Sequence, residues 1–278
     1  EVNNAEMEQF AGYRLGDLVG KVGLEKVWEE ELRGRSGGQQ IEIDASGRKL
    51  QVLDEVQAQP GRNLILTLDL ELQEKAERTL QEVEGALVVL SVHTGEVLAM
   101  VNRPAFNPNL FARGIRRSEW RQLLENPLHP LTNRVIQGQY PPGSTFKPIM
   151  AAAALEEGVI TSETQFRCQG GLLFGGRMFG CWKRSGHGRV DLKQALAQSC
   201  DVYFYQIGQR LGIQKIAEYA RRFGLGQDIH IALEHAASGI IPDAVWKRNR
   251  FGTPWYAGET LPVVIGQGYV TATPLQMA

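Results

Sequence analysis

Apolar and polar positions along the first part of the chain predict a small module. Residues 23–32 carry apolar side chains at a helical period, which predicts a short helix. Residues 40–43 and 49–53 alternate apolar and polar side chains, as exposed strands do. Pro60 is followed by glycine, a pair that commonly ends a structured segment. We therefore expect an accessory module at residues 1–60 and a larger domain at residues 61–278.

The next stretch predicts a helix packed on an antiparallel sheet. Asp69 precedes a segment whose apolar side chains recur at helical spacing, so it is placed to cap a helix. Residues 86–92 and 96–101 are two apolar runs joined by a turn, and they predict a hairpin buried on both faces. A further short strand is expected at residues 64–67. Strand, helix and hairpin in this order indicate an α+β fold.

The second half of the chain predicts a helical subdomain. Residues 144–157 form one helical segment, and Asp191 is placed to cap a second one. Two more helices are expected at residues 202–210 and 213–223. The whole pattern predicts an antiparallel sheet packed with helices, with a helical subdomain beside it.

Composition and net charge exclude several classes of protein. The chain has 278 residues, of which 43% are hydrophobic and 22% charged, and this excludes disordered and collagen-like chains. A net charge of −1 argues against a nucleic-acid-binding protein. No apolar run approaches the length of a membrane span, and the first residues do not resemble a signal peptide. Because the chain begins and ends abruptly, we expect a fragment, so that any membrane anchor would lie outside it.

A serine and a lysine at the start of a helical segment suggest a nucleophile. Ser144 and Lys147 are three residues apart, so a helix places them on one face. The helix N-terminus favours negative charge on the serine oxygen, and a neutral lysine amine can accept the serine proton. The alternative is an ordinary helix cap followed by a surface lysine. A second triplet, Ser199-Cys200-Asp201, favours the nucleophile because it matches the companion motif of S-x-x-K enzymes.

With these motifs, the chain resembles the class B penicillin-binding proteins, which are transpeptidases without a glycosyltransferase domain. It is most similar to the penicillin-binding protein 2 group, the elongation enzymes of rod-shaped bacteria. The likeness extends over nearly the whole chain, at residues 20–25, 30–34, 95–100 (GEVLAM), 107–111 (NPNLF), 133–134, 140–148 (YPPGSTFKP), 199–205 (SCDVYFY), 254–260 (PWYAGET) and 265–268 (IGQG).

The resemblance implies roles for four residues. Ser144 would be the acylated nucleophile and Lys147 its proton acceptor. Ser199 would relay a proton between Lys147 and the leaving amine. Asp201 stands where relatives outside this group often have asparagine, and an ionised aspartate only accepts hydrogen bonds. It would therefore hold either a substrate N–H or a lysine.

The resemblance also implies a fold, a reaction and a location. The fold would be the penicillin-binding and serine β-lactamase-like transpeptidase fold, with part of an N-terminal pedestal at residues 1–60. The reaction would cross-link peptidoglycan stem peptides through a serine acyl-enzyme, which β-lactam antibiotics would trap. Partners would include a membrane-embedded lipid-II glycosyltransferase and scaffold proteins of the elongation complex. The site of action would be the periplasmic face of the bacterial inner membrane, reached through an N-terminal anchor helix absent from this chain.

One motif of the family is missing. The third motif, Lys-[Thr/Ser]-Gly, does not occur before the chain stops, so we expect the C-terminal part of the domain to lie beyond residue 278. Two alternatives share S-x-x-K: a serine β-lactamase or a β-lactam sensor domain. A catalytically silent scaffold is a third alternative.

All three cysteines lie close together in the sequence. With His187 they form the series Cys168-x12-Cys181-x5-His187-x12-Cys200, a Cys3His set that suits four-coordinate structural zinc. The glycine-rich segment between them would gain stability from a metal clip. A Cys168–Cys181 disulfide, or three unrelated buried thiols, are the alternatives. Because neighbours in an extended segment point opposite ways, zinc at Cys200 would hold Ser199 and Asp201 toward the active site.

Overall fold

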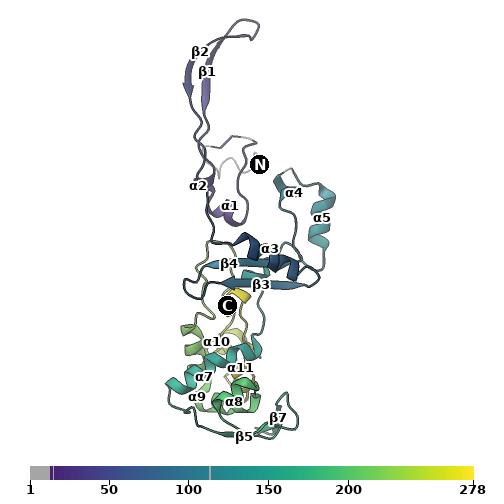
Figure 1. The fold of residues 1–278 in the computed structure, drawn as a ribbon, viewed down its shortest axis with the longest axis vertical. Helices are drawn as coiled ribbons and strands as arrows, with labels where there is room; N and C mark the ends of the chain where they lie inside the picture. The colour runs from purple at the N-terminus through teal and green to yellow at the C-terminus, as the bar shows by residue number, and fades with distance from the viewer. Residues whose placement is uncertain (1–12, 15, 113) are drawn as a thin grey trace. The chain divides into compact units, whose positions relative to one another are not determined.

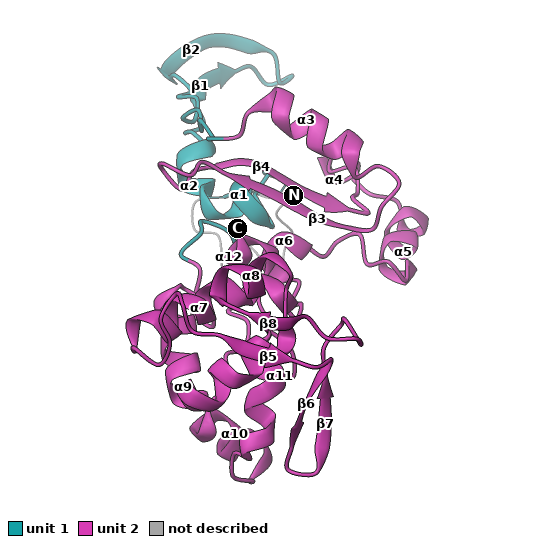
Figure 2. Ribbon diagram, turned by 60° about the horizontal axis from the view of Figure 1, so that its bottom comes forward, with its two compact units in different colours: residues 1–67, 230–235 teal, residues 68–229, 236–278 magenta. Residues whose placement is uncertain are grey.

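The chain folds into two compact units, which Figure 2 shows in different colours. The structure is a computed structural model that describes residues 13–278 except 15 and 113. The first unit extends to Thr67 and also includes His230–His235, and the second contains the rest of the chain. The first unit thus extends beyond residue 60, where the sequence suggests a boundary.

The first unit consists of two short helices and a hairpin: α1 (Gly23–Val27), α2 (Glu29–Leu32), β1 (Gly38–Ile43) and β2 (Lys49–Val56). The helix expected at residues 23–32 is divided at Trp28, whose φ of −108° and ψ of 21° are not helical. The two strands pair antiparallel, and all of their residues are exposed, as expected. Neither helix contains a buried residue, so this unit has little core within the described chain.

The second unit contains all remaining helices and strands of the described chain (Figure 1). In order they are α3 (Leu70–Thr79), β3 (Gly85–Leu90), β4 (Val97–Arg103), α4 (Asn109–Ala112), α5 (Arg117–Glu125), α6 (Arg134–Gln137), the 3-10 helix η1 (Gly143–Phe146), α7 (Lys147–Glu156), β5 (Phe166–Cys168), β6 (Gly171–Phe174), β7 (Arg177–Gly180), β8 (Gly188–Val190), α8 (Leu192–Ala197), α9 (Asp201–Arg222), α10 (Ala244–Phe251), η2 (Ala257–Glu259), α11 (Thr260–Val264) and α12 (Pro274–Met277). The strands form three two-stranded antiparallel sheets, β3–β4, β5–β8 and β6–β7. In the part of the chain that the structure describes, no helix has both the length and the apolar composition of a membrane span.

Helix α3 packs on the hairpin of β3 and β4, as expected (Figure 1). The Asp69 side chain accepts a hydrogen bond from the Leu72 N–H at 2.9 Å, which confirms it as the helix cap. Ala76 of α3 packs with Ala99 and Val101 of β4 in a small buried cluster. Apolar residues of this face therefore hold the helix on the sheet.

Two details of the expected sheet are wrong. Every residue of β3 is only half-buried, so the hairpin is not buried on both faces. Helix α3 packs apolar side chains against the hairpin, and α6 and α12 also contact its strands. Residues 64–67 form no strand, and Ile65 is 92% exposed. An apolar run without a neighbouring strand has nothing to pair with, and it stays extended coil.

A second, larger core lies among the helices of the subdomain. Its buried members from η1, α7, α9 and α11 include Phe146, Met150, Tyr203, Phe204, Ile207, Ile216 and Leu261. Helix α9 includes both helices expected after residue 201, and a non-helical Gly212 (φ 71°) separates them. Gly208 lies so close to α11 that a Cβ atom there would be 2.9 Å from the Cβ of Val264. This close packing fixes α9, which begins beside Ser199.

Candidate active site and metal centre

The backbone before α7 presents Ser144 to solvent. Gly143 adopts a left-handed conformation (φ 58°), and Ser144 follows in the 3-10 turn η1. The Gly143 N–H donates to the Gly266 carbonyl at 2.8 Å. A Cβ atom at Gly266 would lie 2.3 Å from the Gly143 oxygen, so only glycine permits this contact. The turn is thereby held in place while Ser144 stays exposed.

Lys147, the first residue of α7, is buried beneath this turn. Its side chain is 2% exposed. The Nζ atom donates three hydrogen bonds: to Ser199 O and Ser199 Oγ at 3.0 Å each, and to Asp201 Oδ1 at 2.7 Å. A buried ammonium group needs such partners because desolvation of a charge is costly. The sequence-based alternative of a surface lysine is therefore wrong.

The C-terminus of α8 sets the position of Ser199. The Ser199 N–H donates to Leu196 O at 3.1 Å and the Cys200 N–H donates to Ala195 O at 2.9 Å, the bonds of a Schellman motif. Ser199 occupies the left-handed position of this motif, with φ of 50°, where glycine is usual. Its Oγ donates to Ser144 Oγ at 2.8 Å. Ser199 thus bridges Ser144 and Lys147.

Asp201 is the first residue of α9 and holds the lysine. One carboxylate oxygen accepts from Lys147, and the other accepts from the backbone N–H of Trp182 at 3.1 Å. The sequence leaves two partners open for Asp201, a substrate N–H or a lysine. In the structure the partner is Lys147. The Trp182 N–H is a partner that sequence reasoning missed, and no side-chain pattern signals a backbone donor.

The four residues form one connected group. Among the hydrogen bonds of the described residues, Ser144 reaches Lys147 through Ser199. Such a chain can carry a proton from the Ser144 hydroxyl to a lysine amine when that amine is neutral. Loss of the proton makes the exposed Ser144 oxygen a nucleophile.

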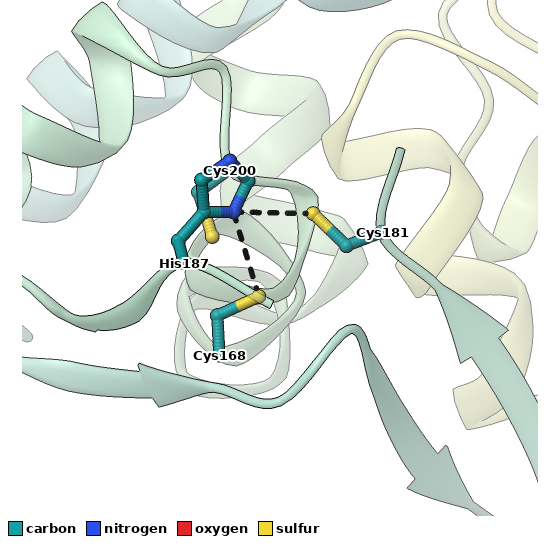
Figure 3. Close-up of side chains that lie close together, drawn as sticks. All are labelled: Cys168, Cys181, His187 and Cys200. Atoms are coloured by element: carbon teal, nitrogen blue, oxygen red, sulfur yellow. Dashed lines mark hydrogen bonds between the residues drawn. The ribbon is translucent and has the colours of Figure 1, made fainter. Parts of the chain in front are cut away.

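The four residues of the Cys3His set also lie close together in the structure. Cys168 ends β5, Cys181 follows β7, His187 precedes β8 and Cys200 is the residue before α9. Their four candidate ligand atoms lie within 4.8 Å of one another. Figure 3 shows one nitrogen of the His187 ring joined by dashed lines to the sulfur atoms of Cys168 and Cys181, with Cys200 close to the ring. All three cysteines are buried free thiols.

The spacing of these atoms suits a tetrahedral metal ion. His187 Nδ1 is 3.6 Å from both Cys168 Sγ and Cys181 Sγ. Zinc–ligand bonds of about 2.3 Å to sulfur and about 2.0 Å to nitrogen give sulfur–nitrogen separations of roughly 3.6 Å in a tetrahedron. His187 Nε2, in contrast, is buried without a hydrogen-bond partner. The donor set therefore fits zinc through Nδ1.

Burial changes the protonation of the candidate ligands. It raises the pKa of the Cys200 thiol to about 12, and it lowers the pKa of His187. The lowered pKa favours the neutral imidazole, the form that binds a metal ion. A bound zinc ion would displace the thiol protons.

Two glycines let the loop between Cys168 and Cys200 fold onto itself. A Cβ atom at Gly170 would lie 2.0 Å from Arg184 O, and one at Gly186 would lie 2.4 Å from Cys168 O. The Cys181 N–H also donates to Gly170 O at 2.9 Å. Backbone segments thus pack directly against one another around the four ligands.

The chain matches two described protein families. Residues 85–278 match "Penicillin binding protein transpeptidase domain", and residues 1–66 match "Penicillin-binding Protein dimerisation domain". A relative from Escherichia coli K12, "Peptidoglycan D,D-transpeptidase MrdA", is 41% identical over 100% of this chain and 45% of its own length. The chain therefore spans less than half the length of this curated relative.

Solved structures of related proteins have a similar fold. Helicobacter pylori PBP2 in complex with MreC has a TM-score of 0.91 at 33% identity, over 99% of this chain and 51% of the other. Pseudomonas aeruginosa PBP2 in complex with WCK 5153 has a TM-score of 0.81 at 38% identity, over 93% of this chain and 55% of the other. The expected transpeptidase fold is confirmed, and the chain belongs to the penicillin-binding protein transpeptidase family.

Proposed function

We propose that this chain is part of a peptidoglycan DD-transpeptidase, with Ser144 as its nucleophile. The observation that carries the proposal is the buried Lys147, bonded to Ser199 and Asp201, with Ser199 bonded to the exposed Ser144. The 41% identity to a relative named as a D,D-transpeptidase supports the reaction class.

In the proposed reaction, Ser144 Oγ attacks the penultimate D-Ala carbonyl of a stem peptide. Its proton passes through Ser199 to Lys147 when the amine of Lys147 is neutral. The Ser144 N–H faces the developing oxyanion as one donor. Collapse of the intermediate breaks the amide bond, the terminal D-Ala leaves with a proton from the Ser199–Lys147 pair, and an ester to Ser144 remains. The amine of a second stem peptide then resolves this ester into a cross-link.

The test is intact-mass measurement of the full-length protein with penicillin. We expect one covalent adduct per chain, loss of the adduct in Ser144→Ala, and an unchanged adduct in the control Ser162→Ala at an exposed loop position. A Lys147→Met variant should slow adduct formation at least 10²-fold. Rapid release of hydrolysed penicillin would instead indicate a β-lactamase, and absence of any adduct would indicate a silent scaffold.

We also propose a structural zinc ion held by Cys168, Cys181, His187 and Cys200. The matched spacing of Nδ1 and the sulfur atoms supports it. Such an ion would join the residue before α9 to the ends of β5 and β7, and it would keep Ser199 and Asp201 at Lys147. Metal analysis of the purified full-length protein should find one zinc per chain. Cys168→Ser should remove the zinc and slow penicillin acylation; normal acylation without zinc would contradict the positioning role.

We infer partners and a location from the family. We propose a membrane-embedded lipid-II glycosyltransferase and elongation-complex scaffold proteins as partners; the Helicobacter pylori relative was solved with MreC, which supports the scaffold. We propose the periplasmic face of the inner membrane as the location, with residues 1–60 as part of a pedestal. Co-purification of the full-length protein with these partners tests the assignment.

A further inference from the structure

A buried ion pair joins α10 to the segment before α11. Lys247 of α10 is 3% exposed, and its Nζ atom donates to Glu259 Oε1 at 2.6 Å. The same ammonium group lies 4.3 Å from the centroid of the Tyr256 ring and 5.9 Å from that of the Trp255 ring. The charge of Lys247 is therefore balanced by one carboxylate and stabilised by two aromatic rings.

Glu259 fixes the start of α11. It is the last residue of η2 and directly precedes the first residue of α11. Its carboxylate accepts the Tyr256 N–H at 2.9 Å, which closes a capping box around this turn. The Trp255 indole N–H donates to Thr260 Oγ1 at 3.0 Å, in the first turn of the helix. The ion pair thus holds the N-terminal end of α11 against α10.

The other end of α11 holds the turn that carries Ser144. The helix packs on α9, where a Cβ atom at Gly208 would lie 2.9 Å from the Cβ of Val264, the last residue of α11. Two residues later, the Gly266 carbonyl accepts the N–H of Gly143 at 2.8 Å. Because Gly143 directly precedes Ser144, a shift of α11 also shifts the Ser144 turn.

Burial excludes a direct part for Lys247 in the reaction. Its side chain is 4% exposed, so it does not reach a substrate. Its hydrogen bonds in the described chain go to Glu259, and none goes to the four candidate catalytic residues. A buried ion pair adds little net stability compared with apolar side chains of similar volume, but loss of one partner leaves the other charge buried and unpaired. The pair therefore constrains position more than it adds stability.

We propose that Lys247 and Glu259 form a positioning pair, which keeps α11 and Gly266 where they aim Ser144 at the substrate carbonyl. The inference rests on the proposed transpeptidase function, because it concerns the rate at which Ser144 is acylated. The pair touches no reacting atom. Lys247 holds Glu259, Glu259 holds the start of α11, and Gly266 beyond its end holds the Ser144 turn.

The experiment follows acylation of the full-length protein by a fluorescent penicillin at several concentrations. The dependence of the observed rate on concentration separates the dissociation constant of the non-covalent complex from the acylation rate constant. The fraction of molecules labelled at the end counts the folded, competent sites. A residue that only stabilises the fold changes the labelled fraction, whereas a positioning residue changes the rate constant of the molecules that react.

We expect Lys247→Met and Glu259→Gln each to lower the acylation rate constant about tenfold or more, and to change the dissociation constant by less than about twofold. The double variant Lys247→Met/Glu259→Gln should recover about a third or more of the wild-type rate constant. It leaves no unpaired charge, the methionine fills the space of Lys247, and the glutamine still accepts the Tyr256 N–H.

The matched control is Leu225→Ala. Leu225 is 1% exposed and follows the C-terminal end of α9, whereas Asp201 begins that helix. The cavity left by this substitution should lower thermal stability and the labelled fraction, and it should leave the acylation rate constant unchanged.

The outcomes separate the two proposals. Unchanged rate constants in both single variants, or a double variant as slow as the single ones, overturn the positioning pair while the transpeptidase stands. An equal loss of rate constant in Leu225→Ala shows a general effect of lower stability and also overturns it. A wild-type protein that penicillin does not acylate overturns the proposed function and the positioning pair with it.

A milder variant decides the matter if a single variant does not fold. Glu259→Asp keeps both charges but draws the carboxylate back by one methylene group. It should lower the acylation rate constant about threefold or more at an unchanged labelled fraction. A wild-type rate constant in Glu259→Asp overturns the positioning pair.

Discussion

Ser199 combines an unfavourable backbone with a central position in the site. A left-handed serine costs about 1 kcal/mol or more compared with glycine. Its Oγ and its carbonyl both bind Lys147, and its Oγ also reaches Ser144. The strain is therefore held at the residue that joins the two candidate catalytic groups.

Two substitutions of Ser199 separate the effect of its backbone strain from the effect of losing its hydroxyl. Ser199→Ala and Ser199→Gly both remove the hydroxyl, and each should slow penicillin acylation about 10²-fold or more. Ser199→Gly should be more stable than Ser199→Ala by about 1 kcal/mol, because glycine adopts a φ of 50° without strain. Urea unfolding and acylation rates measure the two effects. Equal stability of the pair would show that the left-handed backbone is not strained.

Asp243 provides a prediction on pH. Burial raises the pKa of its carboxyl, but the Trp246 N–H and the Arg221 guanidinium outweigh burial, and the pKa lies below its ordinary value of 3.8. The aspartate thus stabilises the fold above about pH 4, and the contribution is lost as pH falls through the lowered pKa. Asp243→Ala should cost about 1–2 kcal/mol near neutral pH and clearly less at about pH 3, measured by urea unfolding. A cost that does not depend on pH would contradict the ionised cap.

For individual residues, the sequence predicted which side chains form the candidate site better than it predicted how they are arranged. S-x-x-K and the second triplet point to Ser144, Lys147, Ser199 and Asp201, and the structure brings the four together. The pattern did not predict that Ser199 lies between Ser144 and Lys147. That arrangement depends on a helix end whose left-handed residue is a serine, where the usual signal is glycine.

In the glycine-rich loop between Cys168 and Cys200, two glycines can be compared directly. Gly170 and Gly176 both have positive φ, 91° and 77°, so alanine is strained at either position. At Gly170 the Cβ atom would also collide with Arg184 O, whereas at Gly176 nothing lies within 4 Å. On the proposed zinc site, we expect Gly176→Ala to cost about 1 kcal/mol and to keep the zinc, and Gly170→Ala to cost more and to lower the zinc content. Metal analysis and thermal unfolding test this; equal metal loss in both variants would contradict it.

Helix caps could be predicted from sequence more reliably than strands. Asp69 and Asp191 each accept a hydrogen bond from the backbone of the helix they precede, as their positions indicate. A cap depends on contacts within four residues. The strand expected at residues 64–67 depends on a distant partner, and the local pattern carries no information about one.

For the whole molecule, stability should differ between the two units. The β1–β2 hairpin is exposed throughout, whereas α9 has buried residues along its full length. Amide hydrogen exchange of the isolated full-length protein should be fast in residues 38–56 and slowest in α9. Comparable protection of the hairpin would show that another part of the protein covers it.

The groups of the proposed active site lie far apart in the chain. Lys147 and Ser199 are separated by 52 residues, and Ser144 and Ser199 by 55. They come together only when α7 and α9 have packed on their common core. On the proposed function, penicillin would label only molecules that have completed this step. The labelled fraction of a newly synthesised population would then count the finished molecules, and the antibiotic would serve as a reporter of folding in the cell envelope.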